Sequence, residues 1–290
     1  MLEDERNDTA SDGFGDDRLK LMFACTHPAI AADAQAPLML QTVLGLDAAR
    51  IAASFPVAPA SMSQRLVRAK RRIRDAGIAF AIPEAEDIPE RLSAVLSAIY
   101  AAYGTAWDDV AGADQRLAGL ADEAIWLVRL TVQLAPDRPE ALGLLAMMLH
   151  CEARRAARRG PGGAFIPLRG QDVTQWSRDL MAEAEGALRA AARAASPGRF
   201  QTEAAIQSLH AQSRITGHRL HGPLSQLYDV LARFAPTTGV LVARAVALAE
   251  NSEPDAALSQ LDAITGAETY QHGGRARPHP VAVRPGSRCP

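Results

Sequence analysis

Two neighbouring stretches decide the fold of the N-terminal part of this chain. They are Asp47-Ala-Ala-Arg-Ile-Ala-Ala-Ser-Phe and Ala60-Ser-Met-Ser-Gln-Arg-Leu-Val-Arg-Ala-Lys-Arg-Arg-Ile-Arg. Asp47 is a good helix N-cap, Pro59 suits a first helical turn, and Gly77 is a typical helix stop. A short helix, a turn of a few residues and a longer helix are the layout of a helix-turn-helix.

The longer of these two helices has an apolar face and a basic face. Met62, Leu66, Ala69 and Ile73 recur every three or four residues, which predicts one buried stripe. In a recognition helix the first turns contact base edges and the later residues contact phosphates. The candidates for base edges are Ser61, Gln64, Arg65 and Arg68. The candidates for phosphates are Lys70, Arg71, Arg72 and Arg74. An arginine-rich face that is merely solvated is the alternative interpretation.

These residues resemble region 4 of bacterial extracytoplasmic-function sigma factors, most closely the subgroup with a C-terminal tetratricopeptide-like extension. The run Asp17-Arg-Leu-Lys-Leu-Met-Phe-Ala-Cys-Thr-His-Pro-Ala-Ile is similar to the segment that leads into region 4 in that subgroup. The resemblance implies binding to the minus-35 promoter element and to the RNA polymerase core, with Ser61, Gln64 and Arg65 facing the bases. Complete sigma factors also have a region 2, which melts the minus-10 element. Only an acidic segment precedes Arg18, so we expect a truncated protein that does not melt promoters alone.

The remainder of the chain shows amphipathic helical segments with short connections, except at 160–170. Leu134-Ala-Pro and Phe234-Ala-Pro form a weak internal repeat, and their prolines are 100 residues apart, close to three tetratricopeptide periods. A generic helical bundle explains the residues equally well; the resemblance favours the repeat architecture. Stacked helical pairs leave a concave face, for which we expect a protein or peptide partner. The expected helices are 88–103, 120–134, 139–158, 175–195, 202–212, 224–234, 239–249 and 254–264.

The net charge of −2 is the sum of four blocks: −6 for 1–17, +6 for 18–80, −6 for 81–270 and +4 for 271–290. This division predicts one module for a polyanion and another for a different partner. The expected organisation is an acidic linker at 1–17, a region 4 domain at 18–80, a helical regulatory domain at 85–268 and a disordered tail at 271–290. The subgroup's pattern continues with another helical pair where this chain changes at Gln271. We therefore expect an exposed apolar face near 240–264.

Several classes of protein are disfavoured by the composition. The longest apolar run, 141–149, is far shorter than the about 20 residues that span a bilayer, and the acidic start has no signal core. Three dispersed cysteines favour a reducing cytoplasm over a disulfide framework. Neither Cys25 with His27 nor His150 with Cys151 has a usual metal-ligand spacing, so we expect no metal and no cofactor. No nucleophile or acid–base pair indicates an enzyme.

The sequence thus predicts an all-α chain, a helix-turn-helix followed by a tetratricopeptide-like domain, acting as a cytoplasmic sigma-type transcription initiation factor. The alternative is a helical interaction scaffold whose basic helix is vestigial.

Overall fold

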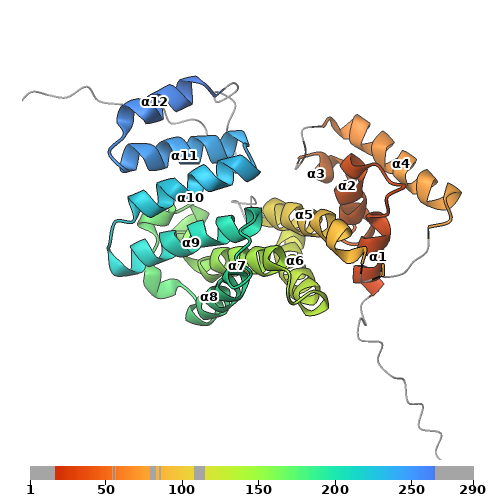
Figure 1. The fold of residues 1–290 in the computed structure, drawn as a ribbon, viewed down its shortest axis with the longest axis horizontal. Coiled ribbons are helices and arrows are strands. Elements are labelled where there is room, and N and C mark those ends of the chain that lie inside the picture. The colour runs from red at the N-terminus through yellow and green to blue at the C-terminus, as the bar shows by residue number, and fades with distance from the viewer. Residues whose placement is uncertain are drawn as a thin grey trace, which may run out of the picture.

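The computed structural model describes residues 17–53, 55, 57–78, 83–84, 86–107 and 115–264, and this part of the chain is all-α. Residues 1–16 and 265–290, for which a linker and a disordered tail were expected, lie outside it. Figure 1 shows α1 to α4 at one end, α9 to α12 at the other, and α5 to α7 between them. The α-helices are α1 (Asp17–Cys25), α2 (Ala32–Thr42), α3 (Ala48–Ala53), α4 (Pro59–Asp75), α5 (Ile88–Trp107), α6 (Gln115–Leu134), α7 (Pro139–Ala153), α8 (Arg178–Ala192), α9 (Arg199–Thr216), α10 (His221–Phe234), α11 (Thr238–Glu250) and α12 (Pro254–Asp262).

Local sequence explains the turns between α2, α3 and α4. Gly45 has a φ of 65°, a left-handed conformation that favours glycine and reverses the chain after α2. Asp47 caps α3 as predicted, because its Oδ1 accepts the backbone N–H of Arg50 at 2.9 Å. Asp33 lies in the first turn of α2, and the N-cap position of this helix is Ala31, which has no side-chain cap.

The N-terminal helices share their core with the helices that follow. α2 and α1 pack on α5, and one cluster of buried apolar side chains extends from Leu19 in α1 to Phe200 in α9. Arg18 adds a polar link, since it forms an ion pair with Glu123 of α6 and lies 4.0 Å from the ring centre of Trp126. The N-terminal helices and the central helices are therefore packed as a continuous structure.

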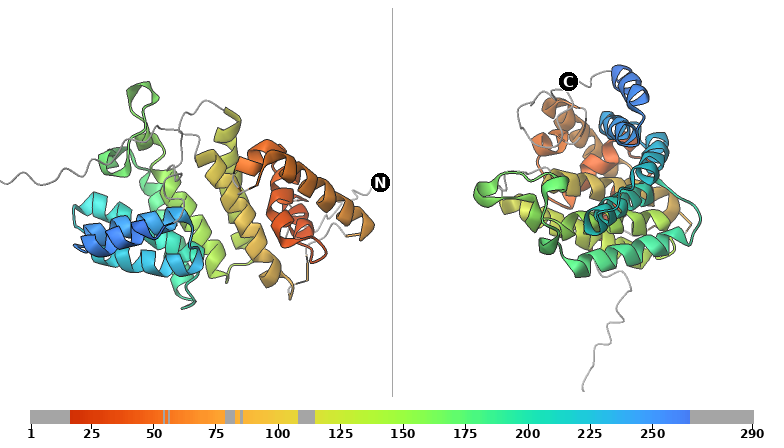
Figure 2. Two further views of the ribbon diagram at one scale, coloured as in Figure 1. Left: turned by 90° about the horizontal axis from the view of Figure 1, so that it is seen from above. Right: turned by 90° about the vertical axis from the view of Figure 1, so that its left-hand side faces the viewer.

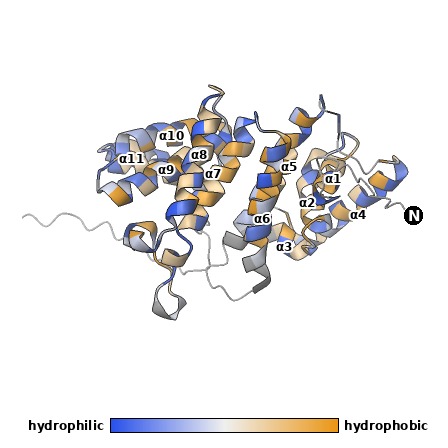
Figure 3. Ribbon diagram, turned by 90° about the horizontal axis from the view of Figure 1, so that it is seen from below, coloured by the Kyte–Doolittle hydropathy of each residue, from blue (hydrophilic) through white to orange (hydrophobic). Residues whose placement is uncertain are grey.

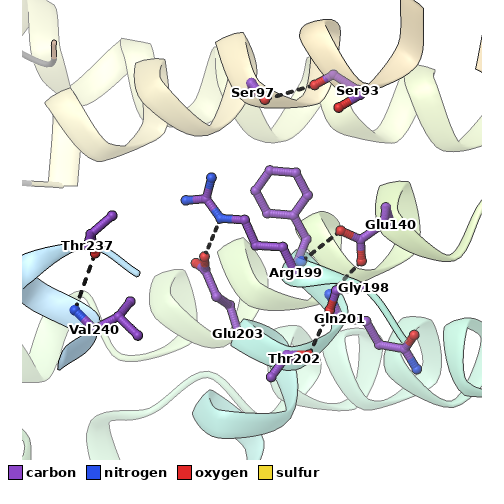
Figure 4. Close-up of polar contacts among 11 residues, drawn as sticks. Ser93, Ser97, Glu140, Gly198, Arg199, Gln201, Thr202, Glu203, Thr237 and Val240 are labelled. Carbon is purple, nitrogen blue, oxygen red and sulfur yellow. Dashed lines mark hydrogen bonds and ion pairs between the residues drawn. The ribbon is translucent and has the colours of Figure 1, made fainter. Parts of the chain in front are cut away.

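α7 and α9 approach each other unusually closely. α7 is hydrophobic along most of its length (Figure 3), and Gly143 makes the close approach possible. A Cβ at position 143 would lie 2.4 Å from the backbone nitrogen of Gln201, a distance that real Cβ atoms essentially never show. Glu140 uses the same proximity: its carboxylate accepts the backbone N–H groups of Phe200 at 2.9 Å and Gln201 at 3.0 Å (Figure 4). The first turn of α9 is thus capped from another helix.

The segment 154–177 replaces the continuous helix expected to reach Arg158. It contains four short 3₁₀ turns and projects from the body of the molecule (Figure 2). Trp176 anchors it by packing with Ala157 and Ala211 in a small separate cluster. Because this segment uses chain length without adding an α-helix, only α7 to α10 lie between Pro136 and Pro236. Two helical pairs, rather than three tetratricopeptide periods, therefore account for the spacing of 100 residues.

The two members of the weak sequence repeat do occupy equivalent turns. Ala135 and Ala235 are both buried, and their N–H groups donate to the carbonyls of Thr131 at 3.0 Å and Leu231 at 2.9 Å. Each ends one helix just before the next begins, at α6–α7 and α10–α11. The repeat therefore marks a recurrent way of turning between helices.

The last described helices, α10, α11 and α12, pack on one another in chain order. In the stretch 240–264, where an apolar face was expected, Val246 on α11 and Leu258 on α12 are 49% and 58% exposed. The apolar face itself stays a prediction. Within the described ranges, no helix is long and apolar enough to cross a bilayer.

Candidate nucleic-acid interface

α4 is built as a helix with one buried side. It begins at Pro59, whose fixed φ suits a first turn, and it ends before Gly77, which has a φ of 60°. Met62, Leu66 and Ala69 are buried and Ile73 is half-buried, so the predicted apolar stripe is confirmed. This stripe sits on α3 and α2 and leaves the opposite side of α4 exposed.

The exposed side of α4 is rich in cations and in hydrogen-bonding side chains. We call this surface the basic face and define it by Ser61, Gln64, Arg68, Lys70, Arg71 and Arg74, which are all exposed. Arg71 lies 3.6 Å from Asp75, the single acidic residue of the helix. The face therefore carries four positive charges against one negative charge over about four turns.

Arg65 is turned away from the basic face toward α2. Its guanidinium donates to the backbone carbonyl of Asp33 at 3.1 Å and lies 3.2 Å from the carboxylate of the same residue. Pro37 explains this contact, because proline has no N–H to donate to the carbonyl four residues earlier, which is that of Asp33. Arg65 therefore satisfies an acceptor that the helix itself leaves unpaired.

Arg72 is on the same flank of α4 as Arg65. Its Nε donates to the carbonyl of Ala29, in the turn between α1 and α2, at 3.3 Å. The structure thus separates the eight predicted residues into six on the basic face and two that tie α4 to segment 29–33.

One exposed residue of α4 was missed from the sequence. Val67 is 67% exposed and lies between Gln64 and Arg68 on the outward side of the helix. The sequence did indicate its exposure, because Val67 falls outside the three- and four-residue spacing of the buried apolar stripe. An isolated exposed apolar side chain is common on protein surfaces, so it indicates no function by itself.

The possible metal ligands are not brought together. Cys25 is buried under α2, with its sulfur 3.5 Å from the Thr42 hydroxyl, and burial raises the pKa of its thiol. Cys151 and His150 lie in α7, where burial raises the pKa of the thiol and lowers that of the imidazole. In the described part of the chain no three His, Cys, Asp or Glu side chains form a group that could hold a metal ion.

Part of the helical region matches a known protein family, and most of the chain is similar to one known protein. Residues 91–192, which correspond to most of α5 to α8, match a family of unknown function, DUF6596. The chain is 38% identical over 281 residues to the uncharacterized protein R00370 of Rhizobium meliloti (strain 1021). This similarity covers 94% of the chain and 66% of the relative, slightly less than two thirds of the relative's length. No solved structure matches.

Proposed function

We propose that this chain is a sigma-type transcription initiation factor that reads promoter DNA with α4. The observation that carries the proposal is the basic face, a row of exposed Arg, Lys and Gln side chains on a helix whose other side is buried. A single α-helix fits the major groove of B-DNA, where Arg and Gln distinguish guanine and adenine by paired hydrogen bonds. The resemblance of residues 47–74 to sigma region 4 identifies the minus-35 element as the proposed target.

Position along the basic face supports a division of tasks among the proposed DNA-binding residues. Ser61, Gln64 and Arg68 lie in the first half of the basic face, where a recognition helix contacts base edges. Lys70, Arg71 and Arg74 follow them, and we propose that they contact phosphates. Arg65 and Arg72 donate to carbonyls of segment 29–33, so we propose that they orient α4 rather than contact bases and phosphates.

The helices that follow α4 form the proposed regulatory part. α5 packs directly on α2, and α2 packs on α4. A partner that binds the helical part and shifts α5 could therefore change the position of α4 through α2 alone. We propose a protein or peptide as that partner and RNA polymerase as the second protein contact of the N-terminal helices.

The experiment is a selection of randomised DNA duplexes by the full chain, followed by affinity measurements on the selected and a scrambled duplex. Arg68→Ala should cost about 1–3 kcal/mol on the selected duplex and much less on the scrambled one. Arg74→Ala should weaken both duplexes alike and lower the slope of log affinity against log salt by about 1.

The matched control is Arg193→Ala, which removes an exposed arginine at the end of α8. It should change neither the affinity nor the salt dependence. If no sequence is enriched and the two duplexes bind equally, the proposal of promoter reading is wrong, and a helical interaction scaffold remains.

A further inference from the structure

Within α4, the positive charge of the basic face is not balanced by negative charge. Arg68, Lys70, Arg71 and Arg74 lie within seven residues, and Asp75 is the only acid in the helix. Arg65 already has its carboxylate partner in Asp33, which shows how this chain neutralises an α4 cation when packing requires it. Asp75 pairs with Arg71 at 3.6 Å, so the basic face keeps an excess of positive charge that suits a ligand with several negative charges.

A polyanion of matching size exists in the same chain. Residues 1–16 carry six carboxylates, Glu3, Asp4, Glu5, Asp8, Asp12 and Asp16, against the single cation Arg6. Their net charge of −5 exceeds the charge that the basic face presents. We propose that this acidic segment binds the basic face of α4 and competes there with DNA.

The covalent connection allows this contact. Residues 1–16 join α1 at Asp17, and α1 has nine residues, so it is about 13 Å long. The turn after α1 touches α4, because Arg72 donates to the Ala29 carbonyl at 3.3 Å. Sixteen residues span at most about 55 Å when extended, which is more than the length of α1 and α4 together. Every cation of the basic face is therefore within reach.

The consequence for DNA binding depends on the proposed function, whereas the contact itself does not. A tethered segment acts at a high effective concentration, so that several weak ion pairs together compete with a free duplex. Salt screens such exposed pairs strongly. The competition should therefore be greatest at low ionic strength and disappear at high ionic strength.

The contact is tested first without DNA. A spin label is attached at Thr9→Cys in a chain that also carries Cys289→Ser, while Cys25 and Cys151 are buried. We expect the label to broaden the backbone amide NMR signals of residues 64–74 at about 25 mM salt, and to lose this effect near 0.5 M salt. Absence of broadening on α4, or broadening concentrated on another basic region such as 154–170, would overturn the proposal.

The competition is then tested by charge removal. Asp4→Asn, Asp8→Asn and Asp12→Asn together should raise the affinity for DNA by about 3- to 10-fold at low salt, and by less at high salt. The matched control removes three exposed aspartates far from α4 in sequence, by Asp137→Asn, Asp179→Asn and Asp255→Asn, and should leave the affinity within about twofold. Equal effects of the two triple variants would show that only net charge matters, and would overturn the competition.

A failure of the proposed function gives a different result. If no variant binds DNA, promoter reading is wrong, and the spin-label experiment still decides whether the acidic segment contacts α4.

Discussion

α4 and α9 are both long helices that lean on an earlier helix, yet their polar contacts are arranged in opposite ways. In α9 the unpaired backbone groups belong to the helix itself: Glu140 of α7 accepts its first N–H groups, where Gly143 lets the two backbones lie close together. In α4 the helix supplies the side chain instead: Arg65 donates a hydrogen bond to a carbonyl of α2 that Pro37 leaves unpaired. In both cases a charged side chain satisfies a backbone group that regular helix geometry cannot satisfy.

The two helices differ in how many of their polar side chains stay exposed to solvent. Each helix has an ion pair within itself, Arg199 Nε with Glu203 Oε1 at 2.9 Å in α9 (Figure 4) and Arg71 with Asp75 at 3.6 Å in α4. α4 spends only Arg65 and Arg72 on neighbouring segments and keeps six polar or cationic residues on its basic face. α9 therefore leaves few of its polar side chains exposed, whereas α4 leaves six on its basic face. In the proposed function these six side chains contact DNA.

The largest expected effect tests the close approach of α7 and α9. Gly143→Ala places a methyl group against the backbone of Gln201, which cannot move aside as a flexible side chain would, so we expect a loss of about 3 kcal/mol or more. The control is Gly186→Ala in α8, where a Cβ meets nothing within 4 Å, and it should stabilise by about 0.5–1 kcal/mol. Chemical denaturation measures both, and equal effects would contradict the close approach.

The next effect concerns the dependence of stability on pH. Burial, together with Arg154 and Arg169, lowers the pKa of His210 on α9 to about 4, from an ordinary 6.5. Because the pKa of His210 is lower in the folded state than in the unfolded state, its contribution to the free energy of unfolding is complete above about pH 6.5. That contribution is lost as the pH falls toward 4. We expect about 2 kcal/mol less stability at pH 5 than at pH 8 from this group.

His210→Gln removes this titration and can still bond to the Tyr228 hydroxyl, which lies 3.3 Å from Nε2 in the wild type. The variant should therefore show a flatter stability profile between pH 8 and pH 5. An unchanged slope would show that the buried imidazole is not the cause.

A smaller effect is expected for the cap of α9. Glu140→Ala leaves the amides of Phe200 and Gln201 without their acceptor and should destabilise the chain by about 1–2 kcal/mol. Glu140→Gln keeps one acceptor oxygen and should cost less. Asp137→Ala, at an exposed residue of the preceding turn, should stay within about 0.5 kcal/mol. Hydrogen exchange at the first turn of α9 would locate the loss.

The smallest effect tests the corresponding contact of α4. Arg65→Ala should cost about 1 kcal/mol, because its guanidinium is partly exposed and Asp33 more so. In a Pro37→Ala background the helix regains the N–H that can pair with the Asp33 carbonyl, so Arg65→Ala should cost clearly less. If the cost is the same in both backgrounds, Arg65 does not act through that carbonyl.

The approximate positions of most helices were predictable because they depend on local sequence. Proline and glycine mark the ends of α4, and the spacing of Met62, Leu66 and Ala69 identifies its buried side. The start of α9 at Arg199 rather than Thr202 was not predictable, since the cap comes from Glu140, about sixty residues earlier. The role of Arg65 likewise depends on Pro37 in another helix. The basic face was predictable in composition, but contacts across helices decided which cations belong to it.

The shared core of α1, α2, α5 and α6 has a consequence for regulation. Any ligand that stabilises one arrangement of α2 against α5 changes the free energy of the surface on which α4 rests. Thermodynamic reciprocity then requires that a duplex held by α4 alters the affinity of the helical part for its own ligand by the same factor. In the proposed function, DNA is thus an effector of the regulatory helices as much as they are effectors of DNA binding.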